Sequence, residues 1–172
     1  MFDKKSTGKV AEVFFQNPSQ SYHLRGLARE ADVSASTASL AVDELVERGL
    51  VKVEKGVTKE VRASRNEKFT DLKMVNNLKK LISSGLLDKL EEVYRPDALV
   101  LFGSYSRGED DSASDIDIAV VNGKESKKAS LSKFEEELER GIKIQMVEID
   151  EVGENFRSTL ANGIVLRGYL DI

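Results

Sequence analysis

The sequence predicts an α/β protein in two parts: a helical part that ends in a β-hairpin, and a part in which strands and helices alternate. Apolar residues recur at helical spacing three times within residues 7–48, and two short strand-like segments follow. The second part opens on the wholly apolar run 98–102 and continues with alternating strand and helix patterns. Hydrophobic residues make up 40% and charged residues 33% of the chain, which is typical of a globular protein.

The first part is expected to hold three helices and a hairpin. Asn17-Pro18 ends the first helix, Ser34 is a good N-cap for the third, and Gly49 ends it. Gly56 joins the two strands. The expected helices cover residues 7–16, 24–31 and 35–48, and the expected strands cover residues 50–53 and 60–62.

This order, with a tight turn between the second and third helices, is that of a winged helix-turn-helix, and residues 33–51 resemble prokaryotic winged-helix regulators. The third helix is then the recognition helix, which places Ser36, Thr37 and Ser39 toward DNA. Basic residues of the wing are expected to contact the DNA backbone. They are Lys52, Lys55, Lys59, Arg62 and Arg65.

The weak positive charge of residues 1–66 is also compatible with a role other than DNA binding. Residues 1–66 carry 11 basic and 9 acidic residues, a net charge of +2, whereas the remainder carries −6. Asp43, Glu44 and Glu47 would repel DNA if they faced it, so a winged helix used for protein contacts or dimerisation is the alternative.

Residues 67–95 are expected to be a helical connector, broken near Ser83-Ser84-Gly85. Its apolar stripes predict core packing or a dimer seam. They consist of Phe69, Leu72, Val75, Leu78 and Ile82, followed by Leu86, Leu90 and Val93. Beyond the connector, the expected strands cover residues 98–102, 142–149 and 164–166. The expected helices cover residues 127–140, which Gly141 is expected to cap, and residues 154–161.

The stretch 101–120, LFGSYSRGEDDSASDIDIAV, is the most informative part of the chain. Gly103-Ser104 end a strand, where backbone amides can approach a phosphate. Asp115 and Asp117 stand one residue apart at the next strand, so their side chains share one face. Paired carboxylates suit Mg²⁺, which completes its shell with water and substrate phosphates. The stretch therefore predicts a site for a metal-bound nucleoside triphosphate.

Gly-Ser followed by Asp-Ile-Asp-Ile resembles the nucleotidyltransferase superfamily that includes DNA polymerase beta and the kanamycin nucleotidyltransferases, and most of all its minimal branch. The resemblance implies a small domain with a mixed sheet backed by helices. It also implies two Mg²⁺ ions on Asp115 and Asp117, a third carboxylate from a later strand, and transfer of AMP from ATP to a hydroxyl. Glu148 fits that third place, with Asp150 as the alternative.

Roles for the neighbouring residues follow. Gly103 would let the backbone close on the phosphates and Ser104 would donate to a phosphate oxygen. Arg107 either neutralises phosphate charge or pairs with Glu109 to brace the loop, and both remain open. Tyr105 is expected to be a packing residue, and the acidic loop 109–114 a solvated turn.

The expected domains are residues 1–66, the connector 67–95 and the transferase domain 96–172. Relatives in the minimal branch act with a helical HEPN-type partner, as antitoxins that adenylylate the toxin, and the resemblance allows that role here. A homodimer is also compatible with the sequence. The competing hypothesis is a DNA-binding regulator whose transferase domain is a nucleotide sensor or a dimerisation module.

Composition narrows the chemistry further. The chain has no cysteine and one histidine, His23, which excludes disulfides, thiolate sites and multi-histidine metal sites. It has no run of eighteen apolar residues and no signal-peptide pattern near the N-terminus. The cytoplasm is therefore the expected compartment, with no membrane as a partner.

Overall fold

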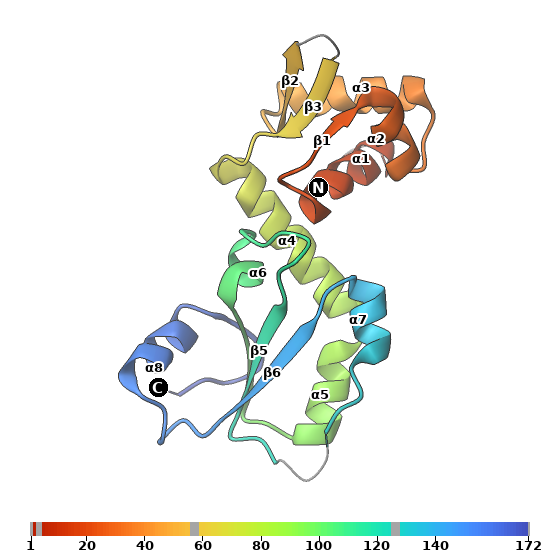
Figure 1. The fold of residues 1–172 in the computed structure, drawn as a ribbon. Helices are drawn as coiled ribbons and strands as arrows, with labels where there is room; N and C mark the ends of the chain where they lie inside the picture. The colour runs from red at the N-terminus through yellow and green to blue at the C-terminus, as the bar shows by residue number, and fades with distance from the viewer. Residues whose placement is uncertain (1, 3–4, 56–58, 125–127, 172) are drawn as a thin grey trace. The chain divides into compact units, whose positions relative to one another are not determined.

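The computed structural model describes residues 2, 5–55, 59–124 and 128–171 (Figure 1). The chain divides into two compact units, Met1–Lys73 and Met74–Ile172. The fold is α/β, as the sequence predicts, with two sheets of which one is mixed. None of the described helices is long and apolar enough to cross a membrane.

The N-terminal unit contains the predicted helices and hairpin in the predicted order. Its central strand, β3, pairs antiparallel with both β1 and β2. Strand β1 is not predicted by the sequence pattern, because three residues are too few to show alternation. The elements are α1 (Lys5–Gln16), β1 (Ser21–His23), α2 (Leu24–Glu30), α3 (Ala35–Glu47), β2 (Val51–Lys55) and β3 (Lys59–Ala63).

Local signals at both ends of α3 are confirmed. The Ser34 side chain accepts a hydrogen bond from the backbone N–H of Thr37 at 3.1 Å, so Ser34 is the N-cap. Gly49 follows the helix with φ +73°, a conformation that costs glycine little. The predicted hairpin turn at Gly56 lies outside the described residues.

The C-terminal unit is built on a four-stranded mixed sheet in the order β6-β5-β4-β7. Strand β4 is antiparallel to β5 and β7, whereas β5 and β6 are parallel and lie side by side in Figure 1. The elements are β4 (Ala98–Phe102), α6 (Gly103–Arg107), β5 (Ile116–Val121), α7 (Ser132–Leu138), β6 (Ile142–Val147), α8 (Glu154–Ala161) and β7 (Ile164–Gly168).

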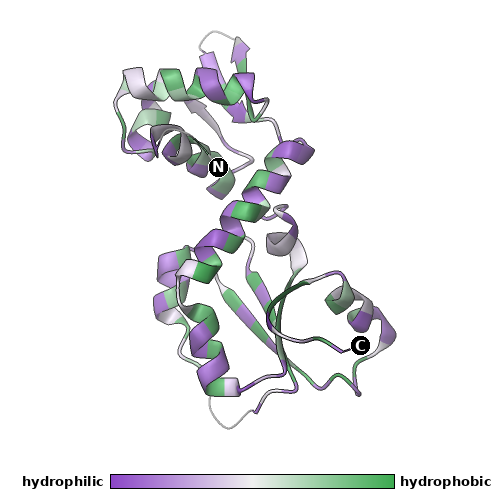
Figure 2. Ribbon diagram, turned by 180° about the vertical axis from the view of Figure 1, so that it is seen from behind, coloured by the Kyte–Doolittle hydropathy of each residue, from purple (hydrophilic) through white to green (hydrophobic). Residues whose placement is uncertain are grey.

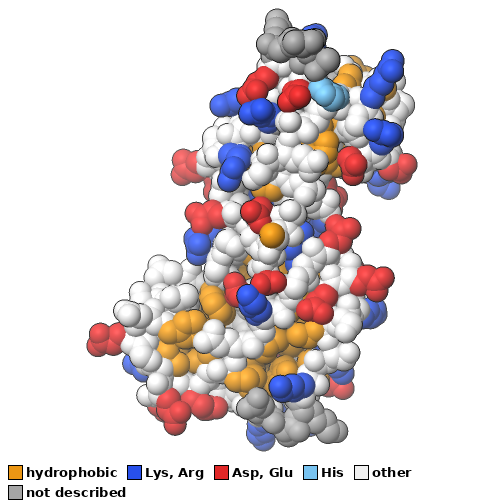
Figure 3. Space-filling model, in the orientation of Figure 1, with side chains coloured by type: hydrophobic (Ala, Val, Ile, Leu, Met, Phe, Trp, Pro, Cys, Tyr) orange, Lys and Arg blue, Asp and Glu red, His pale blue; other side chains and the backbone are white. Residues whose placement is uncertain are grey.

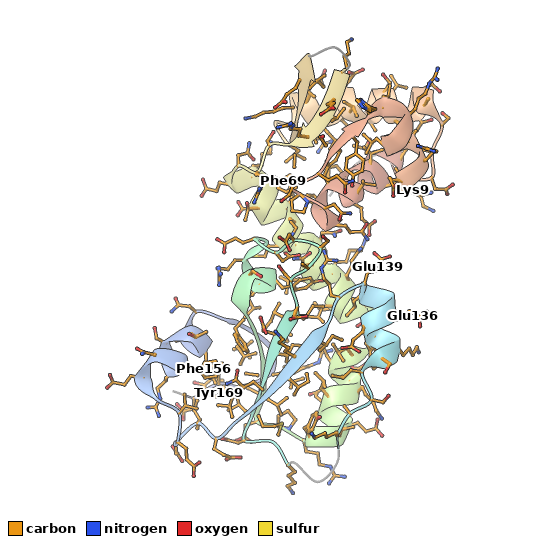
Figure 4. The ribbon with its side chains drawn as sticks, in the orientation of Figure 1. Lys9, Phe69, Glu136, Glu139, Phe156 and Tyr169 are labelled. Carbon is orange, nitrogen blue, oxygen red and sulfur yellow. The ribbon has the colours of Figure 1, made fainter. Side chains whose placement is uncertain are left out.

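Two helices precede this sheet, α4 (Glu67–Ser83) and α5 (Leu86–Tyr94), and Gly85 breaks them with φ +78°. Residues 67–95 do not form a unit of their own. Phe69 belongs to the N-terminal core, where its ring lies 5.2 Å from that of Phe15, whereas Leu81 and α5 pack in the C-terminal core (Figure 4 labels Phe69).

The two faces of the sheet have separate cores. Ile116, Ile118 and Val120 of β5 pack on one face with α5 and Leu138 of α7. Ala119 and Val121 pack on the other face with Leu160 of α8. On this second face, the ring of Phe156 from α8 meets that of Phe102 edge to face, with the ring centres 5.4 Å apart (Figure 4 labels Phe156). The alternation of β5 therefore assigns Asp117 to the α8 face.

The apolar stripe predicted for α4 is partly wrong. Val75 is 46% exposed and Ile82 is 53% exposed, whereas Leu81 and the polar Asn77 are buried. The buried positions are four residues apart, and Asn77 fills one of them because its amide has buried partners. Two polar residues in the buried row, Lys73 and Asn77, hid this row from a hydrophobicity pattern. Hydrophilic and hydrophobic residues both occur along α4 and α5 (Figure 2).

Two further predictions are corrected beyond β5. Helix α7 is shorter than predicted: it ends at Leu138, and the next residue, Glu139, has φ +54° and takes the place predicted for Gly141. The predicted start of this helix lies partly outside the described residues. Strand β6 ends at Val147, so Glu148 lies just beyond it.

Candidate active site

The turn from β4 into α6 brings bare backbone beside a carboxylate. Gly103 is the first residue of α6 and has φ +76°, which favours glycine. A Cβ atom on Gly103 would lie 2.6 Å from Oδ2 of Asp117. Glycine is therefore required here for both its conformation and its lack of a side chain. The hydroxyl of Ser106 donates to the Gly103 carbonyl at 2.8 Å and closes the turn.

Asp117 is the second residue of β5, and Asp115 comes immediately before the strand. Asp117 lies opposite Phe102 of β4 on one side and Lys143 of β6 on the other. Asp115 precedes the strand and leaves no room for a Cβ on Gly141. Glycine at 141 thus admits the first carboxylate instead of capping a helix.

The electrostatics of Asp117 are those of a partly buried acid. Burial is the largest influence and raises the pKa of Asp117; the ammonium of Lys143 lowers it, and the charge of Asp115 raises it. A raised pKa means that the ionised carboxylate is less stable here than in water. A divalent cation would reverse that penalty.

Lys143 is the residue of this site that the sequence interpretation missed. Its Nζ lies 2.6 Å from Oδ2 of Asp115, and this hydrogen bond, followed by the charge of Asp115, raises the pKa of Lys143. The two aspartates have no basic neighbour along the chain, but Lys143 reaches them from the parallel strand. The alternation Ile142-Lys143-Ile144-Gln145 marks Lys143 as outward-facing, but only the strand register shows what it faces.

The prediction that Glu148 joins the two aspartates is wrong. In the parallel β5–β6 pair, Asp117 lies opposite Lys143, and Glu148 comes five residues later. At about 3.3 Å per residue, that puts Glu148 about 16 Å further along the sheet. Asp150, the alternative, lines a separate cavity of about 400 Å³ with Asp97 and Arg157 at that other end. The residues opposite and following Asp117 on this face of β6 are Lys143 and Gln145.

The loop before Asp115 is mostly exposed, as predicted for residues 109–114, but the prediction is wrong for Asp110, which is buried and anchors the loop. Asp110 is only 1% exposed and accepts a hydrogen bond from Asn77 of α4 at 2.7 Å. The Asn77 amide also donates to the Tyr105 carbonyl at 3.1 Å, and Arg140 forms an ion pair with Asp110 at 3.8 Å. This buried network holds the loop and thereby the approach to Asp115.

Arg107 and Tyr105 both have structural roles that the sequence analysis considered. Arg107 pairs with Glu109 at 2.7 Å, which is the loop-bracing alternative. Tyr105 is buried in the core, as predicted for a packing residue, and burial raises its pKa. Arg107 also borders a cavity of about 260 Å³ with Gly103, with Ser158 and Thr159 of α8, and with Asn162, which follows that helix.

Residues 83–166 match the family model of the nucleotidyltransferase domain.

The matched range begins at the end of α4 and runs into β7, so it includes the whole candidate site, from Gly103 to Lys143. It leaves out the N-terminal unit. A search of curated proteins and a search of solved structures each found no match. The nucleotidyltransferase domain supports nucleotidyl transfer as the general activity of this part of the chain.

The donor set of this nucleotidyltransferase domain fits one divalent cation. Asp115 and Asp117 supply oxygen ligands, and the Gly103 backbone lies against Asp117 without a side chain in the way. Within the described residues, no cluster of three or more Asp, Glu, His or Cys side chains could hold a metal ion. The three-carboxylate centre predicted from Asp115, Asp117 and Glu148 is therefore not assembled.

The candidate DNA-contacting residues lie on α3 and the hairpin. Ser36 is exposed, and its hydroxyl lies 2.9 Å from that of Ser34, while Thr37 and Ser39 are partly exposed. The same helix exposes Leu40, at 67%, together with Val46 and two acidic residues. The exposed face of α3 is therefore neutral to acidic.

The hairpin is more basic than the exposed face of α3, but acidic neighbours offset part of its charge. Arg62 pairs with Glu54 at 3.2 Å, and His23 lies 3.8 Å from Glu60. Lys52 and Lys59 are exposed, whereas the side chain of Lys55 lies outside the described set. On the face drawn in Figure 3, basic and acidic side chains of this unit are interspersed.

Proposed function

We propose that the C-terminal unit transfers a nucleoside monophosphate from a Mg²⁺-bound nucleoside triphosphate, with ATP as the expected donor, to a hydroxyl group. The observation that carries this proposal is the placement of Asp115 and Asp117 against the bare backbone of Gly103 inside the matched nucleotidyltransferase domain. Mg²⁺, when bound there, would neutralise charge on the triphosphate and polarise the reacting phosphorus.

The chain's own residues would bind the metal ion and orient the triphosphate. Asp115 and Asp117 hold the ion, Gly103 leaves room for the phosphates, and Ser104 donates to a phosphate oxygen. Arg107 reaches phosphate only by releasing Glu109. The acceptor oxygen forms a bond to the α-phosphorus as the bond to the pyrophosphate oxygen breaks, and pyrophosphate leaves with the electron pair.

The acceptor hydroxyl must also lose its proton. With Glu148 about 16 Å away, no carboxylate other than the two metal ligands stands on this face of β5 and β6 in the described residues. The base is then supplied by water or by the molecule that carries the hydroxyl. This supports an acceptor on a partner protein, for which the resemblance to the minimal branch suggests a helical HEPN-type protein.

Transfer is tested by incubating the protein with Mg²⁺ and each nucleoside triphosphate labelled at the α-phosphate, with and without cell extract. We expect label from ATP to appear on a macromolecule, because pyrophosphate and not the α-phosphate is released. Glu148→Gln should transfer at the rate of the unaltered protein, since Glu148 lies at the other end of the sheet.

The absence of labelled product with every triphosphate and extract would contradict the transfer proposal. A loss of transfer in Glu148→Gln would instead contradict the assignment of the site. The competing proposal, a regulator whose domain binds nucleotide without turnover, has a specific observation in its favour: Lys143 occupies the face where a third carboxylate is expected.

For the N-terminal unit, we propose a winged helix-turn-helix that contacts DNA through Ser36, Thr37, Ser39 and basic residues of the hairpin. The support is the order of helices around the capped turn at Ser34 and the exposed start of α3. The exposed Leu40 and Val46 favour the alternative use, protein contact.

If this unit binds DNA, the affinity should be modest and should fall as salt rises, because basic side chains release counterions from phosphates. Replacing the exposed Lys52 and Lys59 with glutamate should weaken binding to all sequences and reduce the salt slope by about 2. Electrophoretic mobility-shift assays at several salt concentrations measure both the DNA affinity and its salt dependence. Lys133→Glu, on α7 of the other unit, is the control, and no shift with any genomic fragment at low salt would favour protein contact.

A further inference from the structure

The ammonium group of Lys143 binds Asp115, one of the two carboxylates that could otherwise hold a metal ion. Lys143 lies directly opposite Asp117 on the parallel strand, and its Nζ is 2.6 Å from Oδ2 of Asp115. Neighbouring strands are about 4.8 Å apart, so Lys143 starts beside one aspartate and reaches the other. One cation of the chain itself therefore pairs with Asp115 and lies beside Asp117 in the sheet.

From this geometry we propose that Lys143 takes the place of a second metal ion, so that the site holds a single divalent ion with each nucleoside triphosphate. This inference rests on the proposed binding of a metal-bound triphosphate, and it revises the two-ion arrangement expected from the resemblance.

Ligand number supports a single ion. Two ions in line with a transferring phosphoryl group need carboxylates to hold both, and the described residues offer two at this place. The next outward positions of β6 carry Lys143 and Gln145, of which one is a cation and the other is uncharged. A third carboxylate at Lys143 would complete the acidic set, whereas the lysine removes one anionic ligand and adds a positive charge.

Charge supports the same conclusion. An ammonium group on Asp115 already offsets part of the repulsion between the two carboxylates, which lessens the attraction for a first ion and opposes a second. The Lys143 side chain is 69% exposed, so substitutions at this position disturb no packed core. The site can therefore be altered at residue 143 without unfolding the domain.

The test counts Mn²⁺ ions bound per chain by electron paramagnetic resonance, with an ATP analogue that has a methylene group between the α- and β-phosphorus and so cannot react. The unaltered protein should bind one ion per bound nucleotide. Lys143→Glu should bind two, because it supplies the missing carboxylate. Lys143→Met should still bind one, about tenfold more tightly, because the repelling charge is gone.

Matched controls are Lys133→Glu and Lys133→Met, which make the same charge changes at an exposed position on α7 and should change neither the count nor the affinity. Two ions in the unaltered protein, or an unchanged count in Lys143→Glu, would overturn the inference while leaving the metal–nucleotide site in place. If the unaltered protein binds neither ion nor nucleotide, the proposed function fails, and this inference fails with it.

Discussion

Replacing Asp115 and Asp117 together with asparagine should abolish Mg²⁺-dependent nucleotide binding. Asparagine keeps the volume of each side chain but removes both anionic ligands, and Mg²⁺ binds through carboxylates plus substrate phosphates. We expect affinity for a non-reacting ATP analogue with Mg²⁺ to fall about 100-fold or more, since even the loss of residues that merely support metal ligands costs 10–100-fold. Isothermal titration measures the change.

The matched control for this experiment is the double variant Glu148→Gln, Asp150→Asn. It removes the same charge from the same domain but at the opposite end of β6. Its nucleotide affinity should equal that of the unaltered protein. If the control loses affinity and the Asp115–Asp117 variant does not, the site lies at the other end of the sheet.

Asp110→Ala should cause the largest loss of stability of the substitutions considered. Asp110 is 1% exposed, accepts a hydrogen bond from Asn77 and pairs with Arg140, whose side chain is 7% exposed. Removing one partner of a buried ion pair leaves the other charge uncompensated, which costs about 3–5 kcal/mol. Urea unfolding should therefore show a lower midpoint.

Glu109→Ala is the control for this effect, because it removes a neighbouring carboxylate whose ion pair with Arg107 is exposed. Exposed pairs contribute about 0–1 kcal/mol, so the urea midpoint should hardly move. A similar small change in both variants would mean that the Asn77–Asp110–Arg140 network does not anchor the loop before Asp115.

Local sequence features predicted much of this protein because they depend only on neighbours along the chain. The Ser34 cap, the break at Gly85 and the strand 98–102 each follow from the conformational preference of a few consecutive residues. The same holds for the shared face of Asp115 and Asp117, which follows from the alternation of a strand. The sequence by itself therefore determined the Gly-Ser and Asp-Ile-Asp halves of the candidate site.

Only the tertiary structure decided which distant residues complete that site. The parallel register of β5 and β6 brings Lys143 to Asp115 and carries Glu148 away, and no pattern within either strand specifies that register. Asp110 looked solvated among acidic neighbours, yet Asn77, 33 residues earlier in the chain, provides its buried partner. Pairing between strands and burial of polar groups depend on contacts between residues far apart in the sequence, and for that reason they emerge only when the chain is folded.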